Sequence, residues 1–332
     1  MQVLLCVVLA VLTGSVTRKA KVEDKKRYIT IFVFCVVMTV GAAGGLNTIL
    51  KTLLNPGDEV VVFAPFFSEY SNYIANYDGV KVVVEPDLET FQPDLEQLEE
   101  KITHRTKAVI MNNPNNPSGV IYSEETIKSI GHILRKKQAE YDTDIYLISD
   151  EPYRELVYTD VEVPYVTKYY DNTIVGYSFS KSLSLPGERI GYLVIPNEVA
   201  DYEKVWEAAS VATRILGFVN APSLMQKAVA ECLDEKTDIS YYAKNRDTLY
   251  EGLKECGYEC VKPDGAFYLF VKSPVANEAV FVAKCKEEHI LVVPATGFAC
   301  PGYVRIAYCV AHETIVNALP GFKRVAEYFK LS

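Results

Sequence analysis

The sequence lacks an excess of basic charge. Its 332 residues include 34 Lys and Arg against 43 Asp and Glu, which gives a formal net charge of -9 at pH 7. Nucleic acids and anionic membrane surfaces attract proteins that present a basic field. The acidic balance argues against both kinds of partner, and any anion that this chain binds must be held by a local cluster of donors.

Cysteine and histidine are also scarce, with eight and four residues respectively. Scattered cysteines in a chain of this length do not form a disulfide framework, and they fit a reducing compartment. The closest pair, Cys256 and Cys260, has no second Cys or His pair at metal-ligand spacing. The sequence therefore predicts a cytoplasmic protein without a metal site.

Long hydrophobic runs are missing. The apolar runs Val3–Leu12 and Ile29–Val40 are both shorter than the roughly 20 residues that span a bilayer. No Lys or Arg precedes the first run, whereas a secretory signal begins with a basic region. The second run is rich in Val, Ile and Phe, and we interpret it as a buried strand rather than a membrane segment.

From Glu59 onward, short β-branched runs alternate with longer amphipathic stretches. This alternation is typical of an α/β fold with a mostly parallel, doubly wound sheet that is covered by helices on both faces. Helices are expected over Asp94–Ile102 and over Ser123–Lys137, where Ser123 is a good N-cap residue. The expected strands are Glu59–Phe63, Val80–Val84, Lys107–Met111, Ile145–Ile148, Thr173–Tyr177 and Tyr192–Ile195.

The pattern changes after a long helical stretch around Val199–Lys244. The C-terminal residues beyond it predict a second, smaller α+β domain with a helix, three short strands and a final amphipathic helix that reaches Phe329. These strands are expected at Ala266–Val271, Ile290–Val293 and Tyr303–Cys309. We therefore expect a large domain over residues 37–245 and a small domain over residues 246–332, preceded by a separate segment over residues 1–36.

Three loops of the large domain concentrate polar side chains directly after predicted strands. Asn112–Gly119 follows the strand that ends at Met111. Ser149–Arg154 follows the strand that ends at Ile148, and Ser178–Lys181 the strand that ends at Tyr177. Ligands of open parallel sheets bind in the crevice beyond the carboxyl ends of the strands. An amide, a carboxylate, a phenol and a lysine are thus predicted to share one crevice.

A lysine at a buried strand end is costly unless it is paired or used covalently. Ser178, Ser180 and Arg189 lie near Lys181 in the sequence, and hydroxyl and guanidinium groups suit a phosphorylated ligand. The glycine-rich turn Val40–Gly45 is expected to open a helix at Leu46, whose free N–H groups would face an anion.

Four motifs in this order resemble those of the class I/II aminotransferases, which have fold type I of the pyridoxal-phosphate enzymes. They are Asn116–Gly119, Asp150–Tyr153, Ser178–Gly191 and Tyr303–Ile306, and the resemblance covers Val37–Phe329. The resemblance implies pyridoxal 5'-phosphate as cofactor, with Lys181 as its Schiff-base lysine and the carrier of the proton during catalysis.

The resemblance also implies roles around the cofactor ring. Asp150 would pair with the ring nitrogen, which makes the ring an electron sink. Asn116 and Tyr153 would hydrogen-bond the phenolic oxygen, and Phe67 would stack on the ring face.

The phosphate would be held by Ser178, Arg189 and the amides of Ala42 and Ala43, with Ser180 beside them. At the other end of the site, the resemblance implies that Arg305, together with Asn116, binds the α-carboxylate of the substrate. Domain closure would then complete the site.

The function implied is transfer of an amino group between an L-amino acid and a 2-oxo acid by a homodimer, in amino acid biosynthesis. A lyase, decarboxylase or synthase of the same fold is the alternative, because the cofactor breaks the bonds and the protein selects which one. A binding protein with impaired catalysis is another, since the family's usual N-terminal arm is not identifiable in residues 1–36, which we expect to be truncated or divergent. Tyr70, Tyr73 and Phe298 permit an apolar or aromatic substrate.

Overall fold

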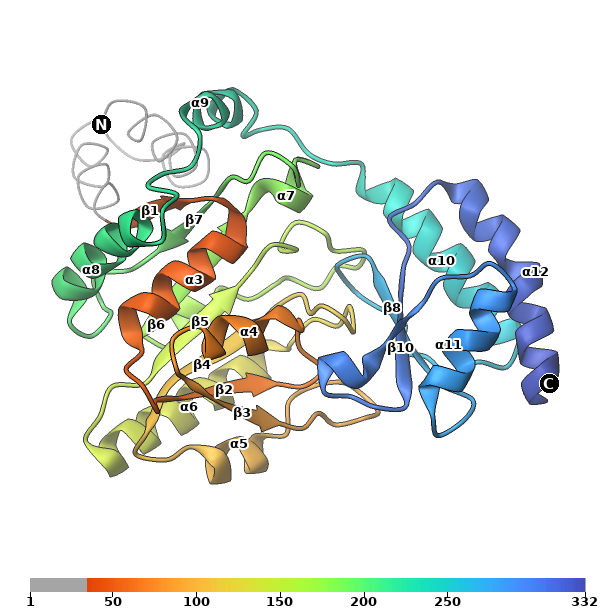
Figure 1. Ribbon diagram of the computed structural model, residues 1–332, viewed down its shortest axis with the longest axis horizontal. Helices are drawn as coiled ribbons and strands as arrows, with labels where there is room; N and C mark the ends of the chain where they lie inside the picture. The colour runs from red at the N-terminus through yellow and green to blue at the C-terminus, as the bar shows by residue number, and fades with distance from the viewer. Residues whose placement is uncertain (1–34, 332) are drawn as a thin grey trace.

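The computed structural model describes residues 35–331 (Figure 1). The run Val3–Leu12 and the first half of the run Ile29–Val40, residues 29–34, lie outside this range. The described strands form a seven-stranded sheet with the order β1-β7-β6-β5-β4-β2-β3 and a three-stranded sheet with the order β8-β10-β9. The larger sheet comprises β1 (Val36–Thr39), β2 (Glu59–Phe63), β3 (Val80–Val84), β4 (Thr106–Asn112), β5 (Tyr146–Asp150), β6 (Thr173–Ser178) and β7 (Gly191–Val194).

The central strands of the larger sheet are parallel. β3, β2, β4, β5 and β6 pair in parallel, whereas β7 runs antiparallel to both β6 and β1. Four of these strands, β2, β4, β5 and β6, are almost entirely buried on both faces, which explains why they appear in the sequence as nearly continuous apolar runs. β3 lies at the edge of the sheet, where Val80 is 43% exposed. The predicted mostly parallel sheet is confirmed, and each predicted strand lies within two residues of its observed bounds.

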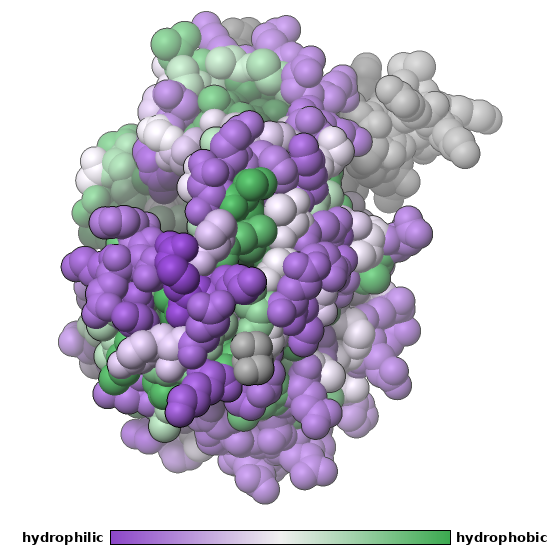
Figure 2. Space-filling model, turned by 90° about the vertical axis from the view of Figure 1, so that its right-hand side faces the viewer, coloured by the Kyte–Doolittle hydropathy of each residue, from purple (hydrophilic) through white to green (hydrophobic). Residues whose placement is uncertain are grey.

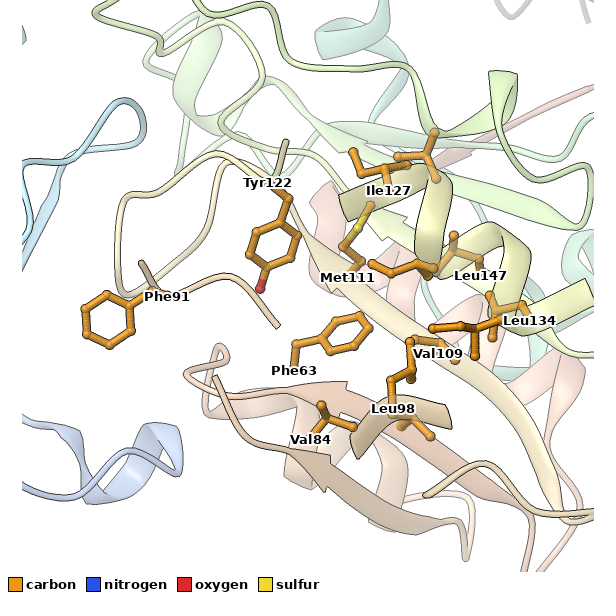
Figure 3. Close-up of a cluster of buried hydrophobic side chains, with 14 of the residues drawn as sticks. Phe63, Val84, Phe91, Leu98, Val109, Met111, Tyr122, Ile127, Leu134 and Leu147 are labelled. Atoms are coloured by element: carbon orange, nitrogen blue, oxygen red, sulfur yellow. The ribbon is translucent and has the colours of Figure 1, made fainter. Parts of the chain in front are cut away.

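Helices cover both faces of this sheet (Figure 1). Val60 and Val62 of β2 point to the face covered by α3 (Gly41–Leu53), α4 (Glu69–Ala75) and α8 (Tyr202–Ile215). Val61, between them, points to the opposite face, under α5 (Leu95–Lys101) and α6 (Glu124–Tyr141). Figure 3 shows this second core, where Leu98 and Leu134 of the helices meet Val109 of β4. The sheet is therefore doubly wound, as predicted.

The expected helical stretch around Val199–Lys244 consists of three separate helices, the last of which continues to Glu255. They are α8, α9 (Ser223–Glu231) and α10 (Ile239–Glu255). Gly217 follows α8 with a φ of 89°, which most side chains disfavour, and Pro222 precedes α9. Asp238 caps α10 by accepting hydrogen bonds from two backbone amides. Both breaks between these helices therefore carry ordinary helix-boundary residues.

The expected start of a helix at Leu46 was wrong. α3 begins at Gly41, so the glycines form its first turns instead of a loop. A Cβ on Gly45 would lie 3.2 Å from a side-chain carbon of Leu193 on β7. The glycines therefore allow this helix to pack closely on the sheet.

The smaller sheet is antiparallel and forms the core of a second unit with α10, α11 (Glu278–Glu287) and α12 (His312–Phe329). It comprises β8 (Tyr268–Lys272), β9 (Val293–Pro294) and β10 (Tyr303–Ala307). The expected strand over Ile290–Val293 was mostly wrong, because only its last residue pairs and Leu291 is 82% exposed. Figure 2 shows that this end of the molecule is mostly hydrophilic.

The expected domain border at residue 246 falls inside α10, which packs along α12. Shorter elements complete the described chain: α7 (Phe179–Ser182) and two 3-10 turns, η1 (Val166–Lys168) and η2 (Ala295–Phe298). Within residues 35–331, no helix combines the length and apolar character that a membrane span requires.

Candidate active site

A cavity of about 290 Å³ lies at the carboxyl ends of β4, β5 and β6. The first turn of α3 forms another part of its wall, and β8 and β10 of the smaller sheet close it. This is the crevice where open parallel sheets bind ligands. The cavity is lined by all the residues that the sequence predicted for the site: Ala42, Ala43, Phe67, Asn116, Asp150, Tyr153, Ser178, Ser180, Lys181, Arg189 and Arg305.

Other lining residues were not assigned from the sequence. They are Leu46, Asn112, Pro152, Pro186 and Tyr268, along with Tyr73, which was considered only for substrate preference. Tyr268 is the most informative, because its hydroxyl lies 3.1 Å from that of Tyr153. It belongs to an apolar strand of the smaller sheet, where a tyrosine is usually part of the core, so the sequence carried no signal for it.

Lys181 extends from α7, a short helix that starts directly after β6. Burial lowers the pKa of its ammonium group, and the nearby guanidinium groups of Arg189 and Arg305 lower it further. Its Nζ lies 5.1 Å from the ring centroid of Phe267, and no described carboxylate forms a salt bridge with it. These surroundings favour a neutral amine, which can act as a nucleophile or a base.

Asp150 ends β5 and is only 4% exposed. Its Oδ2 accepts a hydrogen bond of 2.5 Å from Tyr70, whereas its Oδ1 is buried without a partner in the described part of the chain. Burial raises the pKa of the carboxyl to about 7, a shift that Tyr70 opposes and Glu151 adds to. A buried acceptor without a partner is costly, so this oxygen is suited to a ligand that donates a proton or carries positive charge.

The raised pKa of Asp150 predicts a pH effect on the protein without ligand. The folded chain holds the Asp150 proton up to a pH of about 7, whereas an unfolded aspartate releases it near a pKa of about 3.9. The stabilisation from this group is therefore complete below about pH 4 and is lost as the pH rises to about 7.

We expect Asp150→Asn to gain stability relative to the wild type across that window, by up to about 1.4 kcal/mol per pH unit. Urea unfolding of both proteins at several pH values measures this difference in the free energy of unfolding. A difference in stability that does not change with pH would contradict the expectation.

Asn116, Tyr153 and Arg305 form a network that joins the two sheets. Arg305 Nη1 donates to Asn116 Oδ1 over 2.9 Å, and Asn116 Nδ2 lies 3.5 Å from the Tyr153 hydroxyl. The Arg305 guanidinium also packs 4.5 Å from the ring centroid of Tyr268 and 4.9 Å from that of Phe298. Its Nε is buried without a partner among the described residues. The guanidinium is thus held in place while part of its donor capacity stays unused.

Donors for an anion gather at the opposite wall. Arg189 is exposed and donates to the carbonyl of Pro186 over 2.7 Å, and the hydroxyls of Ser178 and Ser180 lie 2.7 Å apart. Gly41 has a φ of 75°, which favours glycine at the point where α3 meets this guanidinium. The amides of the first turn of α3 have no partners within that helix, and together with the arginine they suit a phosphate.

Two of the aromatic residues considered for substrate preference do not line the cavity. Tyr70 is 1% exposed and bonds Asp150, and Phe298 is buried beside Arg305. Tyr73 and Phe67 do line it. Of the three aromatic residues, Tyr73 is therefore the one that can contact a ligand in this cavity. Local sequence does not show which face of a turn a side chain occupies.

The chain is similar to known aminotransferases over most of its length. The family model described as aminotransferase class I and II matches residues 25–321. The aspartate aminotransferase of Thermotoga maritima is 33% identical over 86% of this chain and 73% of that protein. The aspartate/prephenate aminotransferase of Thermus thermophilus is also 33% identical, over 87% of this chain and 74% of that protein.

Solved structures of aminotransferases are also similar to this chain. The crystal structure of an amino transferase from Eubacterium rectale is 45% identical, with a TM-score of 0.90, and the match covers 98% of this chain and 80% of that one. The family match begins at residue 25, before the expected start at Val37. With this fold and this extent of similarity, the chain belongs to the class I and II aminotransferases, enzymes that move an amino group between an amino acid and a 2-oxo acid.

Proposed function

We propose that the cavity holds pyridoxal 5'-phosphate, attached at Lys181, and that the chain uses it to move an amino group from an L-amino acid to a 2-oxo acid. The observation that carries the proposal is the buried, unpartnered Oδ1 of Asp150 in a cavity that also contains the Lys181 amine. Bound pyridoxal phosphate supplies an aldehyde that captures amino groups and a ring that withdraws electrons from the substrate carbon.

The hydrogen-bond donors and acceptors of the cavity fit pyridoxal phosphate. Arg189, Ser178, Ser180 and the amides of Ala42 and Ala43 would hold the phosphate, because they combine a guanidinium, hydroxyls and a helix start. Asp150 would accept a hydrogen bond from the protonated ring nitrogen through Oδ1 and so keep positive charge on the ring.

On the other side of the cavity, Asn116 and Tyr153 would donate to the phenolic oxygen of the cofactor, since both line the cavity within one hydrogen-bond network. Phe67, which also lines the cavity, would pack on the ring face.

Lys181 would hold and move the proton of the reaction. Its lowered pKa increases the fraction of neutral amine at neutral pH, which a base needs in order to remove a proton from the substrate carbon. The same nitrogen can then return that proton to a different atom. Proton transfer by one positioned side chain contributes roughly 100-fold to 10,000-fold to a rate.

Arg305 would bind the substrate α-carboxylate, assisted by Asn116. The planar guanidinium already lies against Tyr268 and hydrogen-bonds Asn116, so its orientation is set before substrate arrives. A fork of two parallel N–H groups matches a carboxylate, and a lysine ammonium at the same place does not.

We therefore expect Arg305→Lys to raise the KM for the amino acid by about 10-fold to 100-fold, the loss of one charge-assisted hydrogen bond. Cofactor affinity should change little, because Arg305 lies on the substrate side. Steady-state kinetics and a cofactor titration measure the two effects. Arg135→Lys, at an exposed arginine 3.9 Å from Asp171, is the matched control. Equal losses of cofactor and substrate affinity would contradict this role.

The proposed reaction is tested by its first half-reaction, in which the amino acid donates its amino group to the enzyme. Purified protein loaded with pyridoxal phosphate is mixed with an amino acid in the absence of any 2-oxo acid acceptor. Amino transfer releases one equivalent of the matching 2-oxo acid per site and then stops, whereas a lyase or decarboxylase turns over continuously. A panel of amino donors with 2-oxoglutarate then identifies the substrate.

We further propose a cytoplasmic homodimer in amino acid biosynthesis. Six of the described cysteines are free thiols, which suits a reducing compartment: Cys232, Cys256, Cys260, Cys285, Cys300 and Cys309. Exposed apolar side chains on and after α8, among them Val211, Ile215 and Leu224, suit a contact between subunits. The molar mass by light scattering is expected to be twice 37.1 kDa, and a single-chain mass would contradict the dimer.

The division into two domains is likewise a proposal. Because α10 belongs to the core of the smaller sheet, we place the border in residues 232–238, before α10, rather than at residue 246. The small domain then begins with a complete helix.

A further inference from the structure

Tyr70 contacts two groups of the site without lining the cavity itself. Its hydroxyl donates to Asp150 Oδ2 over 2.5 Å, across 80 residues of sequence. Its ring meets the ring of Phe67 edge-on, with centroids 5.7 Å apart and an angle of 85° between the planes. A stacked contact with Phe66, at 6.3 Å and 13°, supports the other side of Tyr70. One buried side chain of α4 therefore touches both the carboxylate and the aromatic wall of the cavity.

We propose that Tyr70 is a positioning residue, which turns the Asp150 carboxylate so that Oδ1 faces the ligand and which supports Phe67 at the cavity wall. The inference rests on the proposed function, since it assigns to Asp150 and Phe67 the two sides of a bound cofactor ring. It adds a residue that acts through others and has no contact with substrate.

The hydrogen bonds of Asp150 show why one hydroxyl decides its orientation. Oδ2 has a short bond to Tyr70 and a weak one to Asn112 at 3.5 Å, and Oδ1 has no partner among the described residues. Removal of the Tyr70 hydroxyl would leave both oxygens nearly without partners. The carboxylate could then rotate, and neither oxygen would be directed to the cavity in preference to the other.

The same bond favours the charged form of Asp150. Burial raises the pKa of Asp150, and the bond from Tyr70 is the main effect that opposes the rise. Glu151, which is paired with Arg154 at 2.8 Å, raises this pKa further. Complete burial also holds the pKa of Tyr70 well above its usual value, and the negative charge of Asp150 adds to that effect. Tyr70 therefore stays protonated and donates over the whole working range of pH.

Tyr70→Phe removes only the hydroxyl and keeps the ring against Phe67. The first measurement uses the protein without cofactor, where infrared difference spectra against Asp150→Asn in the same background follow the protonated carboxyl. We expect the midpoint to rise from about 7 by about one to two pH units, because a hydrogen bond to a charged group is lost.

The second measurement is the dissociation constant for pyridoxal phosphate as a function of pH. It should rise by about 5-fold to 50-fold at pH 7, and the difference should shrink as the pH passes the new midpoint. A merely structural change would weaken binding equally at every pH.

Tyr146→Phe is the matched control, because it removes a buried tyrosine hydroxyl of β5 that bonds the carbonyl of Ala200 over 3.2 Å. It should move neither the carboxyl midpoint nor the pH profile of binding. A Tyr70→Phe midpoint equal to that of the wild type and of this control would overturn the proposal.

A second variant covers the case in which Tyr70→Phe does not fold. Difluorotyrosine at position 70 keeps the shape and donates a stronger hydrogen bond, so the Asp150 midpoint should fall instead of rise. An unchanged midpoint overturns the proposal. If wild-type protein binds no pyridoxal phosphate, the proposed function fails, whereas the carboxyl titration still reports on the bond between Tyr70 and Asp150.

Discussion

Lys181→Ala is expected to abolish amino transfer, with a fall in kcat/KM of about 10,000-fold or more. The variant loses both the amine that attaches the cofactor and the base that moves the proton, and each is worth several powers of ten in enzymes that use them. The neighbouring groups of the site, Asp150, Arg189 and Arg305, are unchanged. Coupled assays of 2-oxo acid formation measure the fall.

Borohydride treatment followed by mass spectrometry gives the second readout. A pyridoxyl adduct is expected on the peptide that contains Lys181 in the wild type and on no peptide of the variant. Lys204→Ala is a suitable control, because this exposed lysine is paired only with Asp201 at 2.8 Å. An adduct on another lysine in the wild type would refute the assignment of the attachment site.

Asp150→Asn is expected to bind the cofactor more weakly and, at saturating cofactor, to lower kcat by about 100-fold to 1,000-fold, the usual effect of removing one preorganised electrostatic contact. The amide keeps the shape of the side chain and can still accept the Tyr70 hydrogen bond. It carries no negative charge, so the ring nitrogen is no longer kept protonated and electron withdrawal weakens.

Absorbance of the bound cofactor and single-turnover release of 2-oxo acid separate binding from chemistry in this variant. Asp264→Asn removes another carboxyl with a pKa raised by burial, outside the lining of the cavity, and should leave kcat unchanged. Near-normal turnover of Asp150→Asn would remove the electron-sink role.

Much of the fold was predictable because local rules and burial agree. Strands buried on both faces must be apolar throughout, and so runs such as Glu59–Phe63 stand out from their surroundings. Ser123 and Asp94 both cap helices through side-chain bonds to backbone amides. Gly217 and Pro222 mark where the predicted helical stretch divides into separate helices.

The sequence by itself determined the sheet type, the loops that meet at its carboxyl edge and the residues that line the cavity through those loops. The connection rules of parallel sheets bring successive strand ends to one crevice, whatever the packing details. Only the tertiary structure decided what lies behind and across from those residues. The bond from Tyr70 to Asp150, the hydroxyl of Tyr268 beside Tyr153 and the burial of Phe298 against Arg305 join segments that are far apart in the chain. Such contacts depend on how α4 and the smaller sheet pack, and no local pattern of residues encodes the direction in which a buried side chain points.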